Sequence, residues 1–133
     1  MLQHLTVRYL DKPRAKNHRE DLSWFCDSLG FCSGRDVHSM AFAIVDALLS
    51  RQAQATSSEA IAEDLRVTAS RVNHHIRNLM DSGFLYREKR HVHLRGGSLK
   101  AAVEEMRKDT NRIFDELGRM AEELDAAHGI KNR

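Results

Sequence analysis

The chain has few of the features that mark membrane-spanning, secreted or disulfide-rich proteins. Its 133 residues include two cysteines and one proline, and no apolar run approaches the roughly 20 residues needed to cross a bilayer. The first residues, which include His4 and Arg8, lack the apolar segment of a secretory signal peptide. We therefore expect a cytoplasmic protein, and the 41% hydrophobic content is enough for one ordinary core.

The two cysteines, Cys26 and Cys32, do not form a CxxC pair, so neither a disulfide framework nor a zinc finger follows from them. A turn at Gly30 could bring them together as a redox sensor. No flanking base or basic cluster is present in the sequence to lower the pKa of either thiol. We therefore favour a reduced core cysteine and an exposed one.

Motifs of enzymes and metal sites are also missing. The sequence has no Gly-rich phosphate loop, nucleophile elbow or paired catalytic carboxylates, so we expect no enzyme and no cofactor. Among eight histidines, His74 and His75 would point about 100° apart on a helix. His91 and His93 share a strand face but have no nearby third ligand. We therefore expect no metal site, and we expect His75 to be packed.

Charge is divided unevenly along the chain. Residues 66–97 hold seven Lys and Arg against two acids, a net charge of +5, whereas residues 36–65 hold one Arg against five acids, a net charge of −4. A concentrated positive charge is expected of a surface that binds a polyanion. The alternative is a solvated basic surface with no partner.

Residues 56–82 have the pattern of two helices joined by a tight turn. Thr56 and Glu59 have the spacing of a capping box, which predicts a helix from about Ser57. Residues 66–68 are short enough to be the turn, and Thr68 would cap the second helix. The inward face of the first helix would be Ala60, Ile61 and Leu65.

The second helix, predicted over residues 69–82, would bury Val72, Ile76 and Leu79 as one stripe. Its outward face carries donors and small side chains, which suit a DNA major groove because Arg can pair with guanine and Asn with adenine. The outward residues are Ala69, Ser70, Arg71, Asn73, His74, Arg77 and Asn78. The predicted base-reading residues are Ser70, Arg71, Asn73, His74 and Arg77.

A β-hairpin follows. Gly83 would end the helix, residues 84–86 have strand character, residues 87–90 form a polar turn, and residues 91–95 alternate apolar with basic. Helix, turn, helix and basic hairpin predict a mainly α fold with a small β-hairpin, the winged helix-turn-helix. We expect the hairpin, residues 87–95, to lie on the DNA backbone or in a minor groove. The predicted backbone or hairpin contacts are Thr68, Asn78, Arg87, Lys89, Arg90, His91 and His93.

The predicted DNA-binding domain covers residues 21–97. Residues 1–20 could be a strand, a disordered terminus or a mobile arm touching DNA. Leu22, Phe25, Cys26 and Leu29 share one helical face that ends at Gly30, with Trp24 at its edge. Ser33 would cap a core helix whose apolar stripe is Val37, Met40, Ala41, Ile44, Ala47 and Leu48.

The last segment has a coiled-coil period. After a cap at Ser98, apolar positions alternate four and three residues apart through residue 127, in a helix about 45 Å long that needs a partner. We predict that residues 98–127 form a dimerisation helix and 128–133 a tail; the alternative is a helix folded back on its own domain. The dimerisation residues would be Leu99, Val103, Met106, Thr110, Ile113, Phe114, Leu117, Met120 and Leu124.

Taken together, residues 29–128 resemble the winged-helix transcriptional regulators of the ArsR/MarR-like superfamily. The resemblance is carried by LGF at 29–31, SEAIA at 58–62, VNHHI at 72–76, LMDSGFL at 79–85, and Leu94-Arg95 followed by Leu99. It implies a homodimer on a roughly palindromic operator, with a small-molecule effector possible but unidentified. Residues 59–65 lack the cysteines of the metal-sensing members, and His128 is the one histidine near the end of the chain. The alternative function is a winged-helix protein-interaction module.

Overall fold

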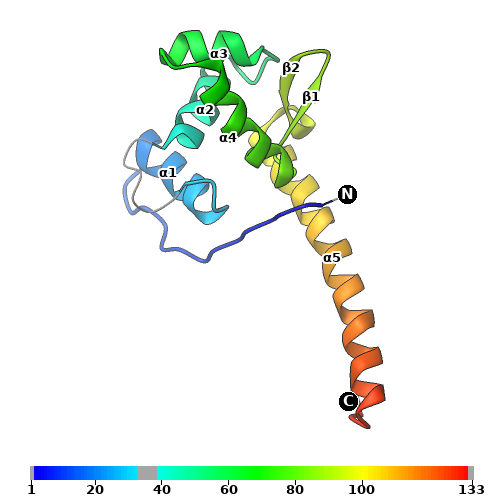
Figure 1. The fold of residues 1–133 in the computed structure, drawn as a ribbon. Coiled ribbons are helices and arrows are strands. Elements are labelled where there is room, and N and C mark those ends of the chain that lie inside the picture. The colour runs from blue at the N-terminus through cyan, green and yellow to red at the C-terminus, as the bar shows by residue number, and fades with distance from the viewer. Residues whose placement is uncertain (1, 33–38, 132–133) are drawn as a thin grey trace.

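The computed structural model describes residues 2–32 and 39–131. Within these ranges the chain is mainly helical, with one two-stranded antiparallel hairpin and a long C-terminal helix (Figure 1). α5 projects away from the other elements. The elements are α1 (His18–Ser28), α2 (Met40–Ser50), α3 (Ser58–Leu65), α4 (Ala69–Asp81), β1 (Leu85–Glu88), β2 (His91–Leu94), the short 3-10 helix η1 (Arg95–Gly97) and α5 (Leu99–Ala127).

Hydroxyl side chains start the helices on either side of the tight turn. The predicted cap at Thr68 is confirmed, because its Oγ1 accepts a hydrogen bond from the Arg71 amide at 3.2 Å. The cap predicted at Thr56 is wrong. Ser57 caps α3 by accepting from the Ala60 amide at 3.1 Å, and Thr56 is buried in a β-bridge with Val92. Arg66 then ends α3 in the left-handed region, with φ of 57°, and opens the turn.

The core helix α2 begins at Met40, and Ser39 is its N-cap. Ser33 and Val37, predicted to cap and open this helix, lie outside the described residues. Val45 is buried although it was not among the predicted core positions. The buried residues of α2 are Met40, Ala41, Ile44, Val45 and Leu48.

Phe84, which follows α4, is the largest fully buried side chain among the described residues. Its ring centre lies 4.9 Å from that of Phe31 and 6.0 Å from that of Phe25. The predicted stripe of α4 is confirmed, since each of its three side chains is at most 1% exposed: Val72, Ile76 and Leu79. Their burial leaves the opposite side of α4 facing outward.

The first strand of the hairpin extends two residues further than predicted, and the turn is tighter. Leu85 pairs with Leu94 and Glu88 with His91, so the loop consists of Lys89 and Arg90 alone. The predicted turn over residues 87–90 is therefore wrong by two residues, and the return strand ends before residue 95. Both loop residues have positive φ, 51° and 67°. Positive φ at both loop positions is typical of a type I′ turn, whose twist matches the right-handed twist of the strands.

α5 is divided between the core and the surface. Ala102, Met106 and Asp109 are buried, whereas residues 111–124 are exposed. The helix up to Thr110 therefore packs on its own domain, and the remainder extends beyond it (Figure 1). No helix among the described residues is both long and apolar enough to cross a membrane.

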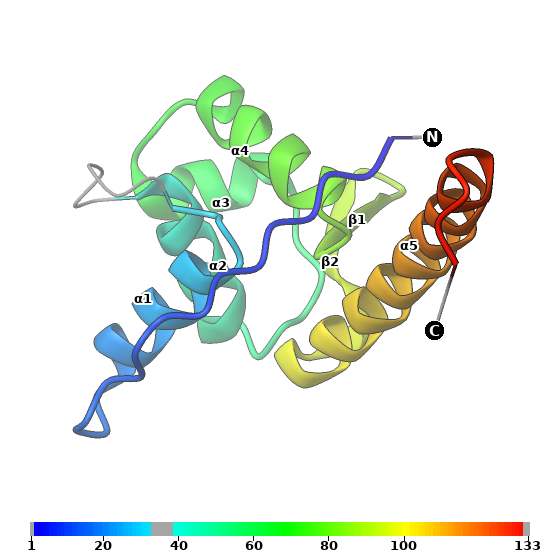
Figure 2. The same ribbon diagram turned by 90° about the horizontal axis from the view of Figure 1, so that it is seen from below.

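The N-terminal arm, residues 2–17, runs across the domain from α1 towards α4 and α5 (Figure 2). It forms no strand in its described part. The His4 amide donates to the Asp81 carbonyl at 3.0 Å, and the Arg8 amide donates to the Ser28 carbonyl at 2.7 Å. α1 begins at His18, so the arm is shorter than the predicted residues 1–20.

Candidate nucleic-acid interface

The outward side of α4 carries most of the side chains predicted for DNA reading. Ala69 and Asn73 are half-buried, and the other predicted outward residues are exposed: Ser70, Arg71, His74, Arg77 and Asn78. Within the described residues, neither Arg71 nor Arg77 forms an ion pair. Both guanidinium groups therefore keep their donors available for an external acceptor.

One hydrogen bond joins α4 to the hairpin. Arg87 Nη2, on β1, donates to Asn73 Oδ1 at 3.0 Å. Pairing of Asn with adenine uses this same oxygen together with the amide nitrogen. Asn73 would therefore have to release Arg87 before it could pair with a base in that way. Arg87 pairs with Val92 near the tip of the hairpin, so the bond connects this end of the hairpin to α4.

The hairpin tip is cationic. Lys89 and Arg90 are exposed, and neither forms an ion pair within the part of the chain that the structure describes. His91 is exposed, and its Nδ1 lies 3.1 Å from the Lys89 carbonyl oxygen. His93 is half-buried and stacks on Tyr86, with ring centres 4.8 Å apart. The positive charge of the hairpin that has no ion pair among the described residues is thus concentrated in the two-residue loop.

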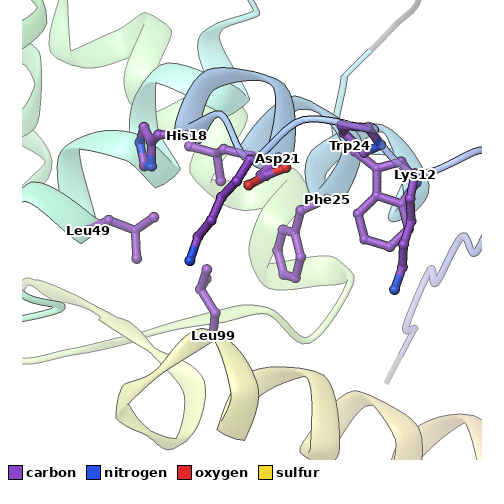
Figure 3. Close-up of a pocket in the computed structure, with 10 residues that line it drawn as sticks. Lys12, His18, Asp21, Trp24, Phe25, Leu49 and Leu99 are labelled. Carbon is purple, nitrogen blue, oxygen red and sulfur yellow. The ribbon is translucent and has the colours of Figure 1, made fainter.

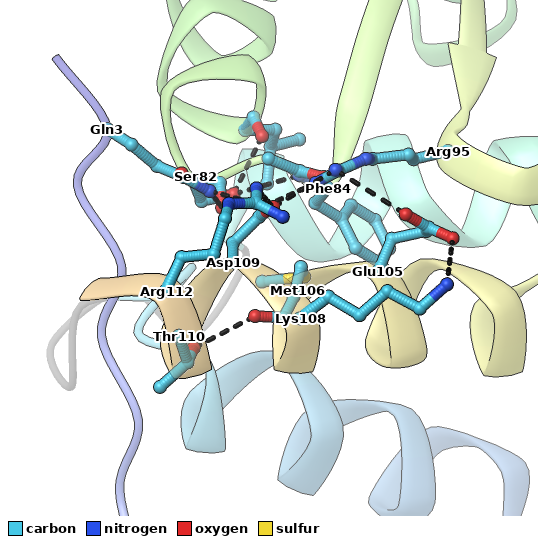
Figure 4. Close-up of polar contacts among 12 residues, drawn as sticks. Gln3, Ser82, Phe84, Arg95, Glu105, Met106, Lys108, Asp109, Thr110 and Arg112 are labelled. Atoms are coloured by element: carbon cyan, nitrogen blue, oxygen red, sulfur yellow. Dashed lines mark hydrogen bonds and ion pairs between the residues drawn. The ribbon is translucent and has the colours of Figure 1, made fainter. Parts of the chain in front are cut away.

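Arg95 does not belong to this exposed charge. Its guanidinium donates to both carboxylate oxygens of Asp109 on α5 and to the Gly83 carbonyl (Figure 4). Asp109 also accepts from Gln3 Nε2 at 2.8 Å and from Arg112. The residues Gln3, Arg95, Asp109 and Arg112 are called the Asp109 cluster below.

The Asp109 cluster fixes the end of the hairpin to α5 and to the arm. Asp109 is 3% exposed, and its hydrogen bonds from Arg95 and Gln3 outweigh desolvation and hold the pKa of the carboxyl at about 2. The same carboxylate raises the pKa of Arg95. Sequence reasoning missed Asp109. Its position between Met106 and Thr110, on the inward side of a helix, was the available signal.

The two cysteines differ from the prediction. Cys26 is 0% and Cys32 is 6% exposed, so the expectation that one of them lies on the surface is wrong. A hydrogen bond from Cys26 lowers the pKa of the Cys32 thiol to about 7, with further hydrogen bonds from Ser39 and the Phe42 backbone. The same interaction raises the pKa of Cys26. The neighbouring thiol of Cys26, and not a flanking base, thus lowers the pKa of Cys32.

The histidine pairs do not come together with other ligands. No group of three His, Cys, Asp or Glu side chains within residues 2–32 and 39–131 is placed to hold a metal ion. The His74 and His75 rings meet edge to face, with centres 5.4 Å apart. His75 is half-buried.

The predicted dimerisation residues fall into two groups. Met106 is 3% exposed inside the core, Leu99 packs against the core, and Val103 and Thr110 are half-buried. The second group is exposed by 38% to 64%: Ile113, Phe114, Leu117, Met120 and Leu124, here called the α5 apolar stripe. A hollow of about 450 Å³ lies beside it, between Gln3 and α5.

Comparison with known proteins gives no relative: no family description, curated protein or solved structure matches the chain. The class of protein is therefore inferred from the arrangement of its own residues.

Proposed function

We propose that this protein is a winged helix-turn-helix transcriptional regulator that binds duplex DNA sequence-specifically as a homodimer. The observation that carries the proposal is the set of unpaired cations on α4 and on the hairpin tip, two surfaces joined by the Arg87–Asn73 hydrogen bond. α3 and α4 are then the two crossed helices of the motif, and the hairpin is the wing. The resemblance to ArsR/MarR-like regulators is consistent with this assignment.

α4 would be the reading helix in the major groove. Arg71 and Arg77 are six residues apart on its exposed side, so they can reach different base pairs. Thr68, the cap of α4, and Asn78, in its last turn, would contact the phosphates. The base-reading set is Ser70, Arg71, Asn73, His74 and Arg77.

The wing would contact the DNA backbone or enter a minor groove. Lys89 and Arg90 hold positive φ without being glycine or asparagine, at a cost of about 1 kcal/mol each. Such strain is found preferentially at binding sites, where the side chain matters more than the turn. The contacting residues would be Arg87, Lys89, Arg90, His91 and His93.

The α5 apolar stripe would bind a second copy of the chain. Large apolar side chains gathered on one side of a projecting helix usually mark an interface. Pairing of two such helices would place two reading helices on one duplex, which matches a roughly palindromic operator. Met106 would support the helix from within its own domain and take no part in the interface.

The proposal can be tested with single substitutions and DNA-binding titrations. Arg71→Ala and Arg77→Ala should each reduce discrimination between the selected site and random duplex by about 1 to 3 kcal/mol per lost base contact. Lys89→Ala and Arg90→Ala should weaken binding to all sequences and lower the salt slope by about one per lost phosphate contact. Fluorescence anisotropy across a salt series measures both quantities.

Arg119→Ala is the matched control, because Arg119 is exposed on the side of α5 away from Leu117. It should leave both quantities unchanged. Unchanged affinity in all four interface variants would reject the proposed surface. A dimer that ignores DNA even in dilute buffer would instead favour a protein-interaction module.

A further inference from the structure

A cavity of about 560 Å³ lies between the arm, α1, the end of α2 and the start of α5 (Figure 3). Its apolar walls come from Leu22, Trp24, Phe25, Leu49 and Leu99. Figure 3 shows Phe25, Leu49 and Leu99 pointing into the same space. Its volume is within the range of about 300 to 1,000 Å³ typical of small-molecule sites.

The arm contributes two lysines to the lining of this cavity. Lys12 Nζ lies 5.8 Å from the centre of the Trp24 ring, and Lys16 lines the cavity without an ion pair to any described residue. Asp21 is the one carboxylate among the lining residues. His18 is occupied by Asp46, whose Oδ1 is 2.9 Å from its Nε2. The rim of an apolar cavity therefore carries unneutralised positive charge.

The arm is attached beside the cavity at two points. The Trp24 indole donates to the Leu10 carbonyl at 3.0 Å, and the Arg8 amide donates to the Ser28 carbonyl at 2.7 Å. These bonds hold the arm against α1, so Lys12 and Lys16 remain close to the aromatic wall. A bound molecule would contact the arm, α1 and α5 at once.

We propose that this cavity binds a small organic carboxylate with an apolar body. The body packs between Phe25, Leu49 and Leu99, and the carboxylate pairs with Lys12 and Lys16. Flexible ammonium groups suit a single anionic head, and the predominantly apolar walls require that the rest of the ligand be uncharged and hydrophobic. The site is built largely from residues 12–25 and does not depend on the proposed DNA binding.

Trp24 is the only tryptophan in the chain, so its fluorescence reports on this cavity alone. We would titrate the protein with two carboxylates whose apolar bodies differ in shape, 4-phenylbutyrate and octanoate. The neutral 4-phenylbutyramide and the cationic 4-phenylbutylamine would be compared with 4-phenylbutyrate. A carboxylate should give a saturable change, with the neutral amide at least about tenfold weaker and the amine weaker still. Ligand should also slow tryptic cleavage after Arg14, because it holds the arm.

The lysines are tested by substitution. The double variant Lys12→Gln with Lys16→Gln should weaken carboxylate binding by about tenfold and leave amide binding unchanged. Asp21→Asn should strengthen carboxylate binding, and Lys131→Gln, a distant lysine, is the control. The proposal is overturned if neither carboxylate gives a saturable change at millimolar concentration. It is also overturned if the amide binds as well as the acid, or if the double variant binds like the wild type.

Discussion

Asp109 shows how a single carboxylate can connect segments that are distant in the sequence. It accepts hydrogen bonds from Gln3 on the arm, Arg95 after the hairpin, and Arg112 on its own helix (Figure 4). A buried carboxylate is stable in this environment because each oxygen has a charged partner. The Asp109 cluster therefore contributes to the position of the hairpin relative to α5.

Replacing Asp109 by Asn should lower the free energy of unfolding at neutral pH by about 2 kcal/mol. The folded-state pKa of Asp109 is about 2 against 3.8 when unfolded, so this stabilisation is present above 3.8. It is lost as pH falls towards 2. Denaturant unfolding of both proteins across this range should show the difference narrowing with acid.

Asp115→Asn is the matched control for this measurement, since Asp115 lies on the same helix and is exposed. It should change stability little at any pH. A constant difference between Asp109→Asn and wild type down to pH 2 would contradict the assigned role of the charge.

Cys32 should be the reactive thiol of the two. Its pKa of about 7 depends first on the hydrogen bond from Cys26, so the rate of alkylation by iodoacetamide should rise with a midpoint near that pH. Cys26→Ala removes the donor and should shift the midpoint upward, towards the ordinary value of 9.0. Mass spectrometry of tryptic peptides measures the rate at each site. A midpoint that stays in place would show that Cys26 is not the cause.

Among the elements, the hairpin has loop residues that do not suit the backbone of its turn. A two-residue loop with positive φ at both positions favours Asn followed by Gly, yet Lys89 and Arg90 occupy it. Local propensity and native backbone therefore disagree at the most exposed part of the proposed interface. Such disagreement is expected where a side chain is retained for binding.

Replacing Lys89 by Asn together with Arg90 by Gly should relieve this strain. The double variant should be more stable by about 1 to 2 kcal/mol, because both new residues adopt positive φ readily. It should also bind DNA less tightly, with a smaller salt slope. Thermal unfolding and anisotropy test the two effects separately. A double variant that is both less stable and equally tight in DNA binding would contradict this account of the turn.

The helices could be predicted from the sequence because their signals are local. The spacing of Val72, Ile76 and Leu79 fixes one face of α4 without reference to the rest of the chain. The choice between Thr56 and Ser57 as the cap of α3 is different. It depends on the pairing of Thr56 with Val92, which is distant in the sequence. The length of the hairpin turn likewise depends on which strand residues pair.

The candidate site likewise has features that could be predicted from the sequence and features that could not. Exposure of Arg71 and Arg77 follows from helical period alone and could be predicted. The Arg87–Asn73 bond, the Asp109 cluster and the cavity beside Trp24 arise from contacts between distant segments, so no local pattern indicates which residues meet there. DNA binding itself remains a prediction.

In the molecule as a whole, α5 extends well beyond the domain that anchors it (Figure 1). Five large apolar side chains line its exposed part, and leaving them in water is unfavourable. A second copy would cover both stripes and place the two α4 helices on one assembly. Dimerisation and DNA binding should therefore be lost together.

Leu117→Asp should convert the proposed dimer to a monomer, because it places a charge at the middle of the α5 apolar stripe. Operator affinity should fall by at least about a hundredfold, since one half-site is then bound alone. Sedimentation measures the mass, and Glu122→Gln, an exposed residue of the same helix outside the stripe, is the control. A Leu117→Asp protein that stays dimeric would remove the stripe from the interface.

The most direct test of the central claim is selection of bound sequences from a pool of random duplexes, followed by measurement of the mass of the selected complex. We expect one enriched motif with two inverted half-sites, bound by two chains per duplex, and loss of that motif with Arg71→Ala and Arg77→Ala combined. A pool without enrichment, or a complex that holds one chain on an asymmetric site, would contradict it.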